Sequence, residues 1–174
     1  MIIETERLIL KSISQEDRDF IFSQFSDEVV TKYLYDEEPL TSISGADEII
    51  DSYVKSESIG QSRWILIRKS DNKKMGTCGF HCWNPSEYTI EIGYDLKEAY
   101  WGCGYMYEAL KAIIAFAVQE LKVRQINAHI YVENDKSTKL AEKLGFKSSG
   151  KEYYYTFRGV EYRHIIYSLD CAML

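Results

Sequence analysis

Residues 90–106 read IEIGYDLKEAYWGCGYM, and this stretch decides the fold of the chain. Residues 90–96 have the apolar and β-branched character of a strand. From Gly104 onward, apolar residues recur every three or four positions, which predicts a long helix with one buried face. The members of that face are Met106, Leu110, Ile113, Ile114, Ala117, Val118 and Leu121.

The turn between this strand and this helix carries Gly102 and Gly104. Glycines remove the Cβ atoms that would keep a ligand away from the main chain. A turn at a helix N-terminus also directs several backbone N–H groups to one point, at the positive end of the helix dipole. The pattern indicates a phosphate site. An isolated Gly-x-Gly also forms plain tight turns, so the neighbouring residues must decide.

The composition is that of one globular domain covering residues 1–174. Hydrophobic residues make up 45% and charged residues 28%, and no apolar run is long enough to span a membrane. The N-terminus has no secretory signal, so we expect a cytoplasmic protein without a membrane partner. The formal net charge of −6 argues against nonspecific binding to nucleic acid, and nucleic acid is not an expected partner.

Four cysteines are expected to be free thiols in a chain of this size without a signal peptide. Cys78 and Cys82, with His81 between them, suggest a metal site. On a regular strand, however, residues four apart lie about 13 Å apart on one face while His81 points to the other face. These residues could not then share a tetrahedral zinc ion, so the sequence predicts no metal.

The remaining elements are predicted from the spacing of apolar residues and from helix-capping and turn residues. Ser14 and Asp17 form a capping-box pattern before a helix, Asn134 caps another helix, and Gly145 ends it. Strands are expected at residues 7–13, 64–68, 75–83, 88–96, 125–132, 147–157 and 161–170. Helices are expected at residues 14–25, 28–33, 44–56, from 104 and from 134, and a loop at residues 58–62. The strands at 88–96 and 125–132 should be parallel, because a whole helix separates them.

In this order and spacing, several motifs together resemble the GNAT superfamily of N-acetyltransferases, in its RimJ/RimL-like branch, over essentially the whole chain. The motifs are Thr5-Glu6-Arg7-Leu8-Ile9-Leu10, Glu91-Ile92-Gly93-Tyr94, the turn at 100–105, Asn134-Asp135-Lys136-Ser137 and Glu142-Lys143-Leu144-Gly145-Phe146. The resemblance implies an α/β (α+β) GNAT fold, in which helices flank a mixed, mostly antiparallel sheet with a central, splayed parallel strand pair.

The resemblance also implies acetyl-CoA as co-substrate, with the main chain at Tyr94 and Leu96 pairing with its pantetheine arm. Asn134 would contact the same arm. The amides from Gly102 to Tyr107, including those of Cys103, Gly104, Tyr105 and Met106, would hold the pyrophosphate. Two residues depart from the family pattern: Trp101 replaces an Arg or Gln, as is usual in this branch, and Met106 replaces a small residue that lies close to the pyrophosphate.

Acetyl transfer to an amine needs a base, a polarised carbonyl and a proton for the thiolate. Glu91 is the preferred base, because it lies three residues before Tyr94 on the strand that leads to the thioester. A solvated or ion-paired carboxylate is the alternative. His81 and His129 are further candidates for the base, and a structural histidine is the alternative reading for each.

A tyrosine seven residues after the Asn cap protonates the thiolate in many GNAT enzymes, but Ala141 stands there. Ser137 is the replacement that we expect to donate the proton or contact the cofactor, with a locally bonded serine as the alternative. Cys103 is read as a turn residue, because direct attack in a ternary complex needs no acyl-enzyme. Tyrosines near residues 33–35 and 153–155, with Glu37 and Glu38, could line an acceptor pocket.

The predicted function is transfer of an acetyl group from acetyl-CoA to a primary amine. An α-amine has a pKa of about 7.7–8.0 and a lysine amine about 10.4, so a peptide N-terminus needs less help from a base. The favoured acceptor is therefore the α-amine of a peptide or protein. Acetylation of an aminoglycoside or polyamine remains open, as does a non-catalytic acyl-CoA-binding regulatory module. Family habit implies a possible homodimer.

Overall fold

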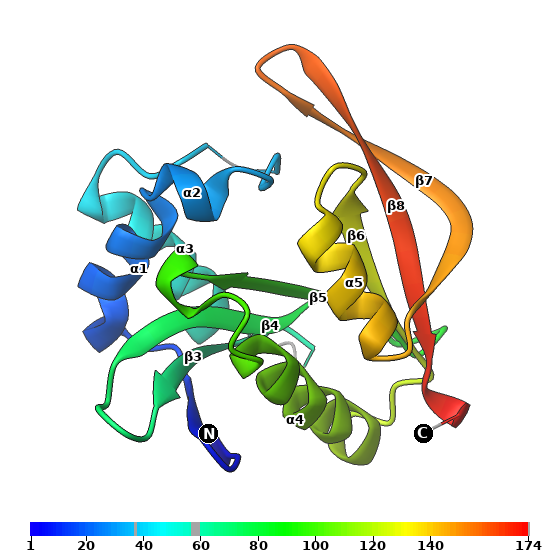
Figure 1. Cartoon of the computed structure of the whole chain (residues 1–174), viewed down its shortest axis with the longest axis horizontal. Helices are drawn as coiled ribbons and strands as arrows, with labels where there is room; N and C mark the ends of the chain where they lie inside the picture. The colour runs from blue at the N-terminus through cyan, green and yellow to red at the C-terminus, as the bar shows by residue number, and fades with distance from the viewer. Residues whose placement is uncertain (37, 57–59, 174) are drawn as a thin grey trace.

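The computed structural model describes residues 1–36, 38–56 and 60–173, so part of the loop expected at 58–62 lies outside it. Within these residues, one eight-stranded sheet has the strand order β1-β2-β3-β4-β5-β6-β8-β7 (Figure 1). The strands are β1 Ile2–Glu4, β2 Leu8–Ser12, β3 Ser62–Arg68, β4 Lys74–Asn84, β5 Thr89–Leu96, β6 Gln125–Tyr131, β7 Lys147–Phe157 and β8 Val160–Asp170. The α-helices are α1 Arg18–Phe25, α2 Glu28–Thr31, α3 Ile43–Val54, α4 Tyr105–Glu120 and α5 Asp135–Lys143.

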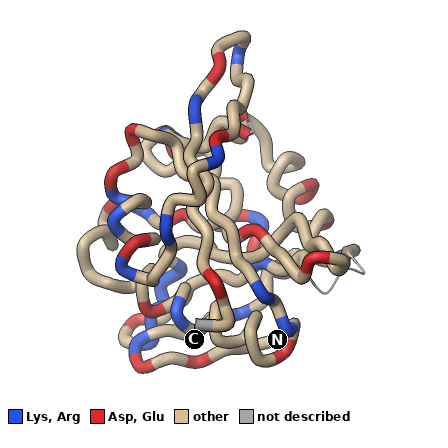
Figure 2. The backbone as a smooth tube through the Cα atoms, turned by 90° about the vertical axis from the view of Figure 1, so that its right-hand side faces the viewer, with Lys and Arg blue, Asp and Glu red and all other residues tan. Residues whose placement is uncertain are grey.

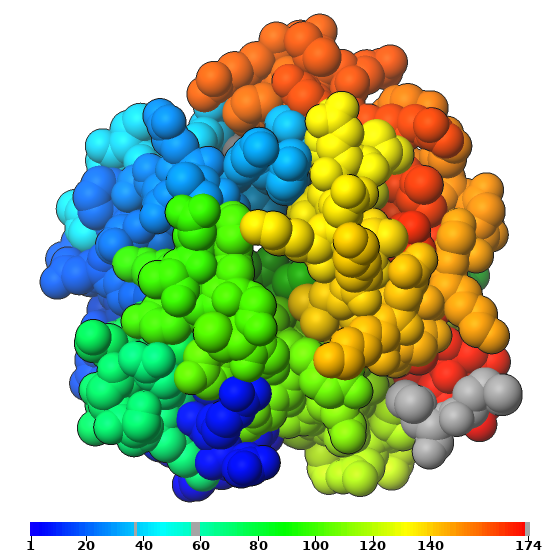
Figure 3. Space-filling view, viewed as in Figure 1, coloured from blue at the N-terminus to red at the C-terminus, as the bar shows by residue number. Residues whose placement is uncertain are grey.

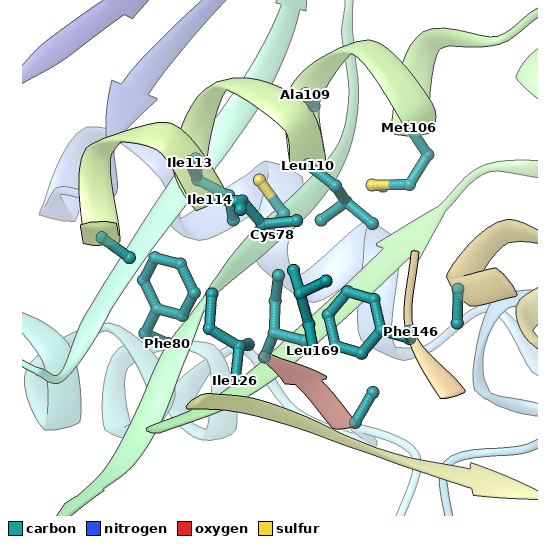
Figure 4. Close-up of a cluster of buried hydrophobic side chains, with 14 of the residues drawn as sticks. Cys78, Phe80, Met106, Ala109, Leu110, Ile113, Ile114, Ile126, Phe146 and Leu169 are labelled. Carbon is teal, nitrogen blue, oxygen red and sulfur yellow. The ribbon is translucent and has the colours of Figure 1, made fainter. Parts of the chain in front are cut away.

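The two faces of the sheet carry separate hydrophobic clusters. In β3, Trp64 and Leu66 pack in a cluster that includes Leu110 of α4 and Phe146 after α5. Ile65, between them in sequence, packs with residues of α1 and α3 on the opposite face. This alternation follows from the two-residue period of a strand. The larger cluster is built around the buried side of α4 (Figure 4).

The parallel pair predicted from the sequence is β5 with β6. The two strands are paired only from Thr89 to Glu91, opposite Gln125 to Asn127. β5 continues to pair with β4 as far as Leu96. The two central strands therefore separate after Glu91, and the mixed, mostly antiparallel sheet with a splayed parallel pair is confirmed.

The predicted helix ends are also confirmed. The Asp17 carboxylate accepts a hydrogen bond from the Ser14 backbone N–H at 2.9 Å, although the first turn after Ser14 is a 3₁₀ helix, Gln15–Asp17. The Asn134 side chain accepts from the Ser137 backbone N–H at 3.2 Å. Gly145 has a φ of +94°, the left-handed conformation of a helix stop, and the Phe146 N–H donates to the Ala141 carbonyl.

Two features of the fold were not predicted. The first is β1, three residues long, which pairs with β2 at the edge of the sheet. The second is the order of the last strands, because β8 lies between β6 and β7. The β7–β8 hairpin extends beyond the rest of the sheet, and its basic and acidic residues are interspersed (Figure 2). No helix among the described residues is long and apolar enough to cross a membrane.

Candidate active site

A cavity of about 130 Å³ lies where β5 and β6 separate. Its walls come from residues 91–94 of β5, residues 128–131 of β6, residues 33–36 after α2, and Asn134 and Ser137 at the start of α5. Figure 3 shows a hollow in this region, between the yellow α5, the green segment that follows β5 and the blue residues near α2. The gap between the diverging strands is therefore the origin of the cavity.

Strand alternation places different chemistry on the two sides of this cavity. Glu91 lies on the same face of β5 as Asp95, whose carboxylate binds Gln24 of α1. Tyr94 points to the opposite face, where its phenol oxygen lies 2.7 Å from the Ser137 hydroxyl of α5. A carboxylate and a pair of hydroxyl groups thus approach one gap from opposite faces of the sheet.

The Glu91 carboxylate lies between two imidazoles. Its oxygens are 3.4 Å from Nε2 of His81 on β4 and 3.7 Å from Nε2 of His129 on β6. The hydrogen bond with His81 lowers the pKa of Glu91, and the charge of a protonated His129 acts in the same direction against the effect of burial. Burial lowers the pKa of His129, which favours the neutral imidazole. The three sequence candidates for a base therefore form one cluster.

The structure corrects the assumption that β4 alternates regularly around His81. A register shift lies between His81 and Asn84, and Cys82 has a φ of +52°. The Cys82 thiol is consequently on the same side as His81, with their ligand atoms and those of Glu91 all within 4.8 Å of one another. Cys78 lies in the buried core and does not belong to this group, as expected. All four cysteines are free thiols, as predicted.

Ser137 and Tyr94 form the hydroxyl pair on the other side. Ser137 is held at the helix start because its backbone N–H donates to Asn134, and its Oγ lies 2.7 Å from the Tyr94 phenol. Burial raises the pKa of Tyr94 to about 12, so the phenol keeps its proton at neutral pH. Sequence reasoning considered only the main chain of Tyr94 and missed this contact. The alternative was a serine that hydrogen-bonds only within its own helix, but the Ser137 hydroxyl contacts the Tyr94 phenol at the cavity wall.

The turn predicted to bind a phosphate leads into a helix that begins where the sequence predicted it, next to Gly104. Gly102 and Gly104 have φ values of +72° and +78°, a left-handed conformation that side chains with a Cβ rarely adopt. α4 begins at Tyr105, so the amides of Tyr105, Met106 and Tyr107 have no carbonyl four residues back within the helix. The Met106 side chain, which replaces a small residue of the family pattern, points into the core beside Leu110 and is only 6% exposed (Figure 4).

Trp101 has a local structural role in this turn. Its indole Nε1 donates to the Leu96 carbonyl at 2.7 Å, and the Lys136 ammonium lies 3.8 Å from the centroid of its ring. The indole thus ties the turn to the end of β5. The Lys97 N–H bonds Met75 of β4, so alternation turns the main-chain groups of Tyr94 and Leu96 toward the gap. One lone pair of the Leu96 carbonyl is already used by Trp101.

The segment between β1 and β2 forms hydrogen bonds with the same turn and with the start of α4. Arg7 donates from Nη1 to the Cys103 carbonyl at 3.0 Å and from Nε to Glu108 of α4 at 2.6 Å. Thr5 donates its hydroxyl proton to the other Glu108 oxygen at 2.6 Å. The N-terminal motif that contains Thr5 and Arg7 therefore positions the turn and the first helical turn after it. The Cys103 thiol is exposed.

The sequence of this chain also matches that of a known protein family. The family model described as "Acetyltransferase (GNAT) domain" matches residues 7–147. The chain belongs to the GNAT acetyltransferase family. It is 32% identical over 172 residues to the uncharacterized N-acetyltransferase YoaA of Bacillus subtilis, covering 97% of this chain and 96% of that protein. It is also 32% identical over 91 residues to the ribosomal-protein-serine acetyltransferase of Escherichia coli, covering 52% and 50% of the two chains.

Solved structures share the fold of this GNAT protein. The crystal structure of spermidine N-acetyltransferase from Vibrio cholerae, in complex with CoA and spermine, matches with a TM-score of 0.84 over 97% of this chain and 98% of that one. The sequence identity is 17%, so this similarity shows the fold alone. The sequence motifs predicted a GNAT acetyltransferase, and this prediction is confirmed.

The remaining walls of the GNAT cavity are aromatic. Tyr35 stacks on Tyr162 of β8 with ring centroids 3.7 Å apart, and its ring contacts Tyr131 of β6 edge-on at 4.9 Å. Tyr155 of β7 lies 3.2 Å from His129 Nδ1 through its hydroxyl, and its ring packs against His164. The residues after α2 and the last hairpin therefore meet over the cavity.

Some aromatic and acidic residues expected near the acceptor are in the lining and others are not. Tyr33, Tyr35 and Tyr155 line the cavity. Tyr153 and Tyr154 are about half exposed on the hairpin. The Glu38 carboxylate is bonded to Arg158, and Glu37 lies outside the described residues.

Three polar residues of the lining were not predicted from the sequence: Asp36, Tyr131 and His164. Tyr131 and His164 belong to strands whose alternation placed them on one face, but no local pattern showed that this face meets the loop after α2. Asp36 belongs to that loop. The signal that brings them together is tertiary.

Proposed function

We propose that this GNAT protein transfers an acetyl group from acetyl-CoA to the α-amine of a peptide or protein, by direct attack in a ternary complex. The observation that carries the proposal is the arrangement around the gap between β5 and β6. The Glu91 cluster lies on one side of the cavity and the Tyr94–Ser137 pair on the other. This arrangement supports a base and an acid acting at opposite ends of one reacting group.

The co-substrate fits the features on the α4 side. Backbone amides at the start of α4 and the left-handed glycines before it suit a pyrophosphate. The edge of β5 at Tyr94 and Leu96, which β6 leaves free of ladder pairing, suits an extended arm with amide groups. Asn134, at the start of α5, also lines the cavity. A carbonyl delivered along β5 would reach the cavity between Glu91 and Ser137.

The reaction forms one bond and breaks one. The neutral amine nitrogen attacks the thioester carbonyl carbon, a C–N bond forms, and the C–S bond breaks. The proton lost by the amine passes to Glu91, directly or through a water molecule, with His81 and His129 holding the carboxylate in place. The sulfur receives a proton from Ser137, which the Tyr94 phenol can replenish through their 2.7 Å contact.

The lining favours a peptide α-amine over a polyamine. Among the described residues, only Glu91 and Asp36 bring carboxylates to the cavity wall, which five tyrosines also line. A polyamine carries several positive charges and needs several carboxylates along its length. The aromatic walls suit the apolar part of a first residue and the face-on approach of a single ammonium group.

The test is thiol release from acetyl-CoA with matched acceptors. We expect turnover with a short peptide that has a free N-terminal serine or alanine and contains one lysine. The same peptide with a blocked N-terminus serves as the control and should give none, because only the lysine amine is left. Turnover of spermidine without turnover of the free peptide would overturn the proposed acceptor.

Calorimetry with acetyl-CoA separates the proposed activity from a binding module. We expect one binding site per chain, with turnover in the assay above. Binding of acetyl-CoA without turnover of any amine in the panel would favour the regulatory module. Absence of binding would overturn both readings. The homodimer and the cytoplasmic location stay predictions, which gel filtration and fractionation can test.

A further inference from the structure

Cys82 has a conformation that the acetyl-transfer proposal does not use. Its φ of +52° lies in the left-handed region, where a residue with a Cβ is uncommon. The irregularity in β4 next to Glu91 places it there. Such a conformation costs about 1–3 kcal/mol and tends to persist where the surroundings require it. Its consequence here is that an exposed thiol faces a carboxylate and an imidazole, those of Glu91 and His81, which line the cavity.

The geometry of this group suits a small cation. The ligand atoms of His81, Cys82 and Glu91 lie within 4.8 Å of one another, and His81 Nε2 is 3.4 Å from the carboxylate. Zn–N bonds of about 2.0–2.1 Å and Zn–S bonds of about 2.3 Å place neighbouring ligands of a tetrahedral ion roughly 3.3–3.8 Å apart. Contraction by about 1 Å is within reach of side chains, since His81 is 38% exposed and Glu91 24%.

The ligand types point to one class of metal. Imidazole and thiolate ligands select zinc and other borderline or soft ions, whereas magnesium and calcium prefer oxygen ligands alone. We propose that His81, Cys82 and Glu91 form a zinc site with three protein ligands, its fourth position open to water on the cavity side. Binding displaces the thiol proton to solvent, since the thiolate is the ligand.

A zinc ion in this position would inhibit acetyl transfer. This consequence rests on the proposed function, because the ion would occupy the Glu91 oxygen that accepts the proton of the amine. His129 Nε2 lies 3.7 Å from the other Glu91 oxygen. With zinc bound, this imidazole would lie beside a metal-bound carboxylate instead of a free one. The site therefore makes turnover sensitive to free zinc.

The binding test uses the full chain without acetyl-CoA. Zinc is titrated in competition with a chromophoric chelator, and we expect one ion per chain. Cys82→Ser should lower the affinity for zinc at least about tenfold. Loss of a residue that only hydrogen-bonds a metal ligand already lowers metal affinity by about 10- to 100-fold, and Cys82 would be a ligand itself. Cys103→Ser is the matched control, because this exposed thiol lies outside the group, and it should bind zinc as the wild type does. Equal affinity in Cys82→Ser and the wild type would overturn the proposal.

Cobalt provides a second readout that does not depend on turnover. Co²⁺ in the site should show a thiolate-to-metal charge-transfer band that Cys82→Ser lacks and Cys103→Ser retains. Magnesium should neither compete with zinc nor quench the band. A band that persists in Cys82→Ser would place the metal elsewhere.

The inhibition test follows thiol release with and without zinc. Zinc should lower turnover of the wild type, a chelator should restore it, and Cys82→Ser should need at least about tenfold more zinc for the same inhibition. Uninhibited turnover at saturating zinc would overturn the regulatory consequence. If no amine is turned over, the proposed function fails, while the zinc and cobalt titrations still decide the site.

Discussion

Glu91 and Asp95 lie four residues apart on the same face of β5, yet their surroundings differ completely. Asp95 is 6% exposed and accepts hydrogen bonds from Arg63, Gln24 and Thr77. Glu91 faces the cavity, and its nearest polar partners are imidazoles at 3.4 and 3.7 Å. One carboxylate is enclosed by fixed donors from three elements, and the other is bordered by groups that can exchange protons.

The difference arises from what lies beyond the strand. At Asp95, α1 and α3 cover the sheet, and Arg63 links the carboxylate to the Tyr53 hydroxyl of α3. At Glu91, β6 begins to diverge and leaves space. The same residue type on the same face is therefore structural where the sheet is covered and chemically available where it opens. Four predictions test this distinction and the groups around it, from the largest expected effect to the smallest.

Asp95→Ala should destabilise the protein by about 3–5 kcal/mol, because Arg63 would remain buried without its carboxylate. Chemical denaturation, with a constant slope between variants, measures the change. The control is Glu16→Ala, which removes an 84% exposed partner of Lys11 and should change stability by less than about 0.5 kcal/mol. Equal stability of the two variants would show that Asp95 is not the structural carboxylate.

Glu91→Gln should lower kcat/KM about 10²-fold or more, because the amide keeps the shape of the side chain but cannot accept a proton. The unfolding free energy should change by less than about 1 kcal/mol, in contrast to Asp95→Ala. Thiol-release kinetics and denaturation measure the two quantities on the same preparation. Turnover within twofold of the wild type would assign the base to another group, with His129 as the next to test.

Ser137→Ala should lower kcat about tenfold to a hundredfold, with little change in the affinity for acetyl-CoA. Tyr94→Phe removes the phenol that lies 2.7 Å from the Ser137 hydroxyl and should have a smaller effect. The double variant should fall short of the sum of the two effects, since the hydroxyl groups act as a pair. Additive losses would show that they act separately, and unchanged turnover in Ser137→Ala would remove it as the acid.

Asp17→Asn should cost about 1–2 kcal/mol at pH 7, the usual range for a charged capping interaction. Burial acts to raise the pKa of Asp17, but hydrogen bonds from Lys74 and Ser14 outweigh it and lower the pKa. Because the pKa of Asp17 is lower in the folded protein than in the unfolded chain, where it is about 3.9, the ionised carboxylate stabilises the fold at pH values above about 3.9. This stabilisation is lost as the pH falls through the pKa of the folded state. The difference between wild type and variant should therefore shrink below about pH 4. A constant difference would contradict the ion pair.

Much of the fold was accessible from local patterns. The capping pair at Ser14 and Asp17, the Asn134 cap and the Gly145 stop each depend on residues within a few positions. β1 was missed because three residues carry too little periodicity to identify a strand. The expected geometry around Cys82 was wrong because no local signal marks the irregularity in β4.

The site divides in the same way. The strand β5, the glycine turn after it and the start of α4 were predictable because they depend on nearby residues, although the left-handed conformation of Gly102 and Gly104 was not predicted. The contacts of Glu91 with His81 and His129, and of Tyr94 with Ser137, join separate strands and helices. Their positions depend on strand pairing and on where β5 and β6 separate, which no single segment encodes.

By itself, the sequence determined the family, the order of most elements and the glycine turn before α4, because these follow from short-range spacing and backbone preference. Only the tertiary structure decided which carboxylate of β5 is enclosed and which meets the cavity. It also decided that the Cys82 thiol faces Glu91. Those outcomes depend on packing between elements that are far apart in the chain. Ordering such distant segments costs conformational entropy, and this cost is offset only by contacts that form in the complete fold.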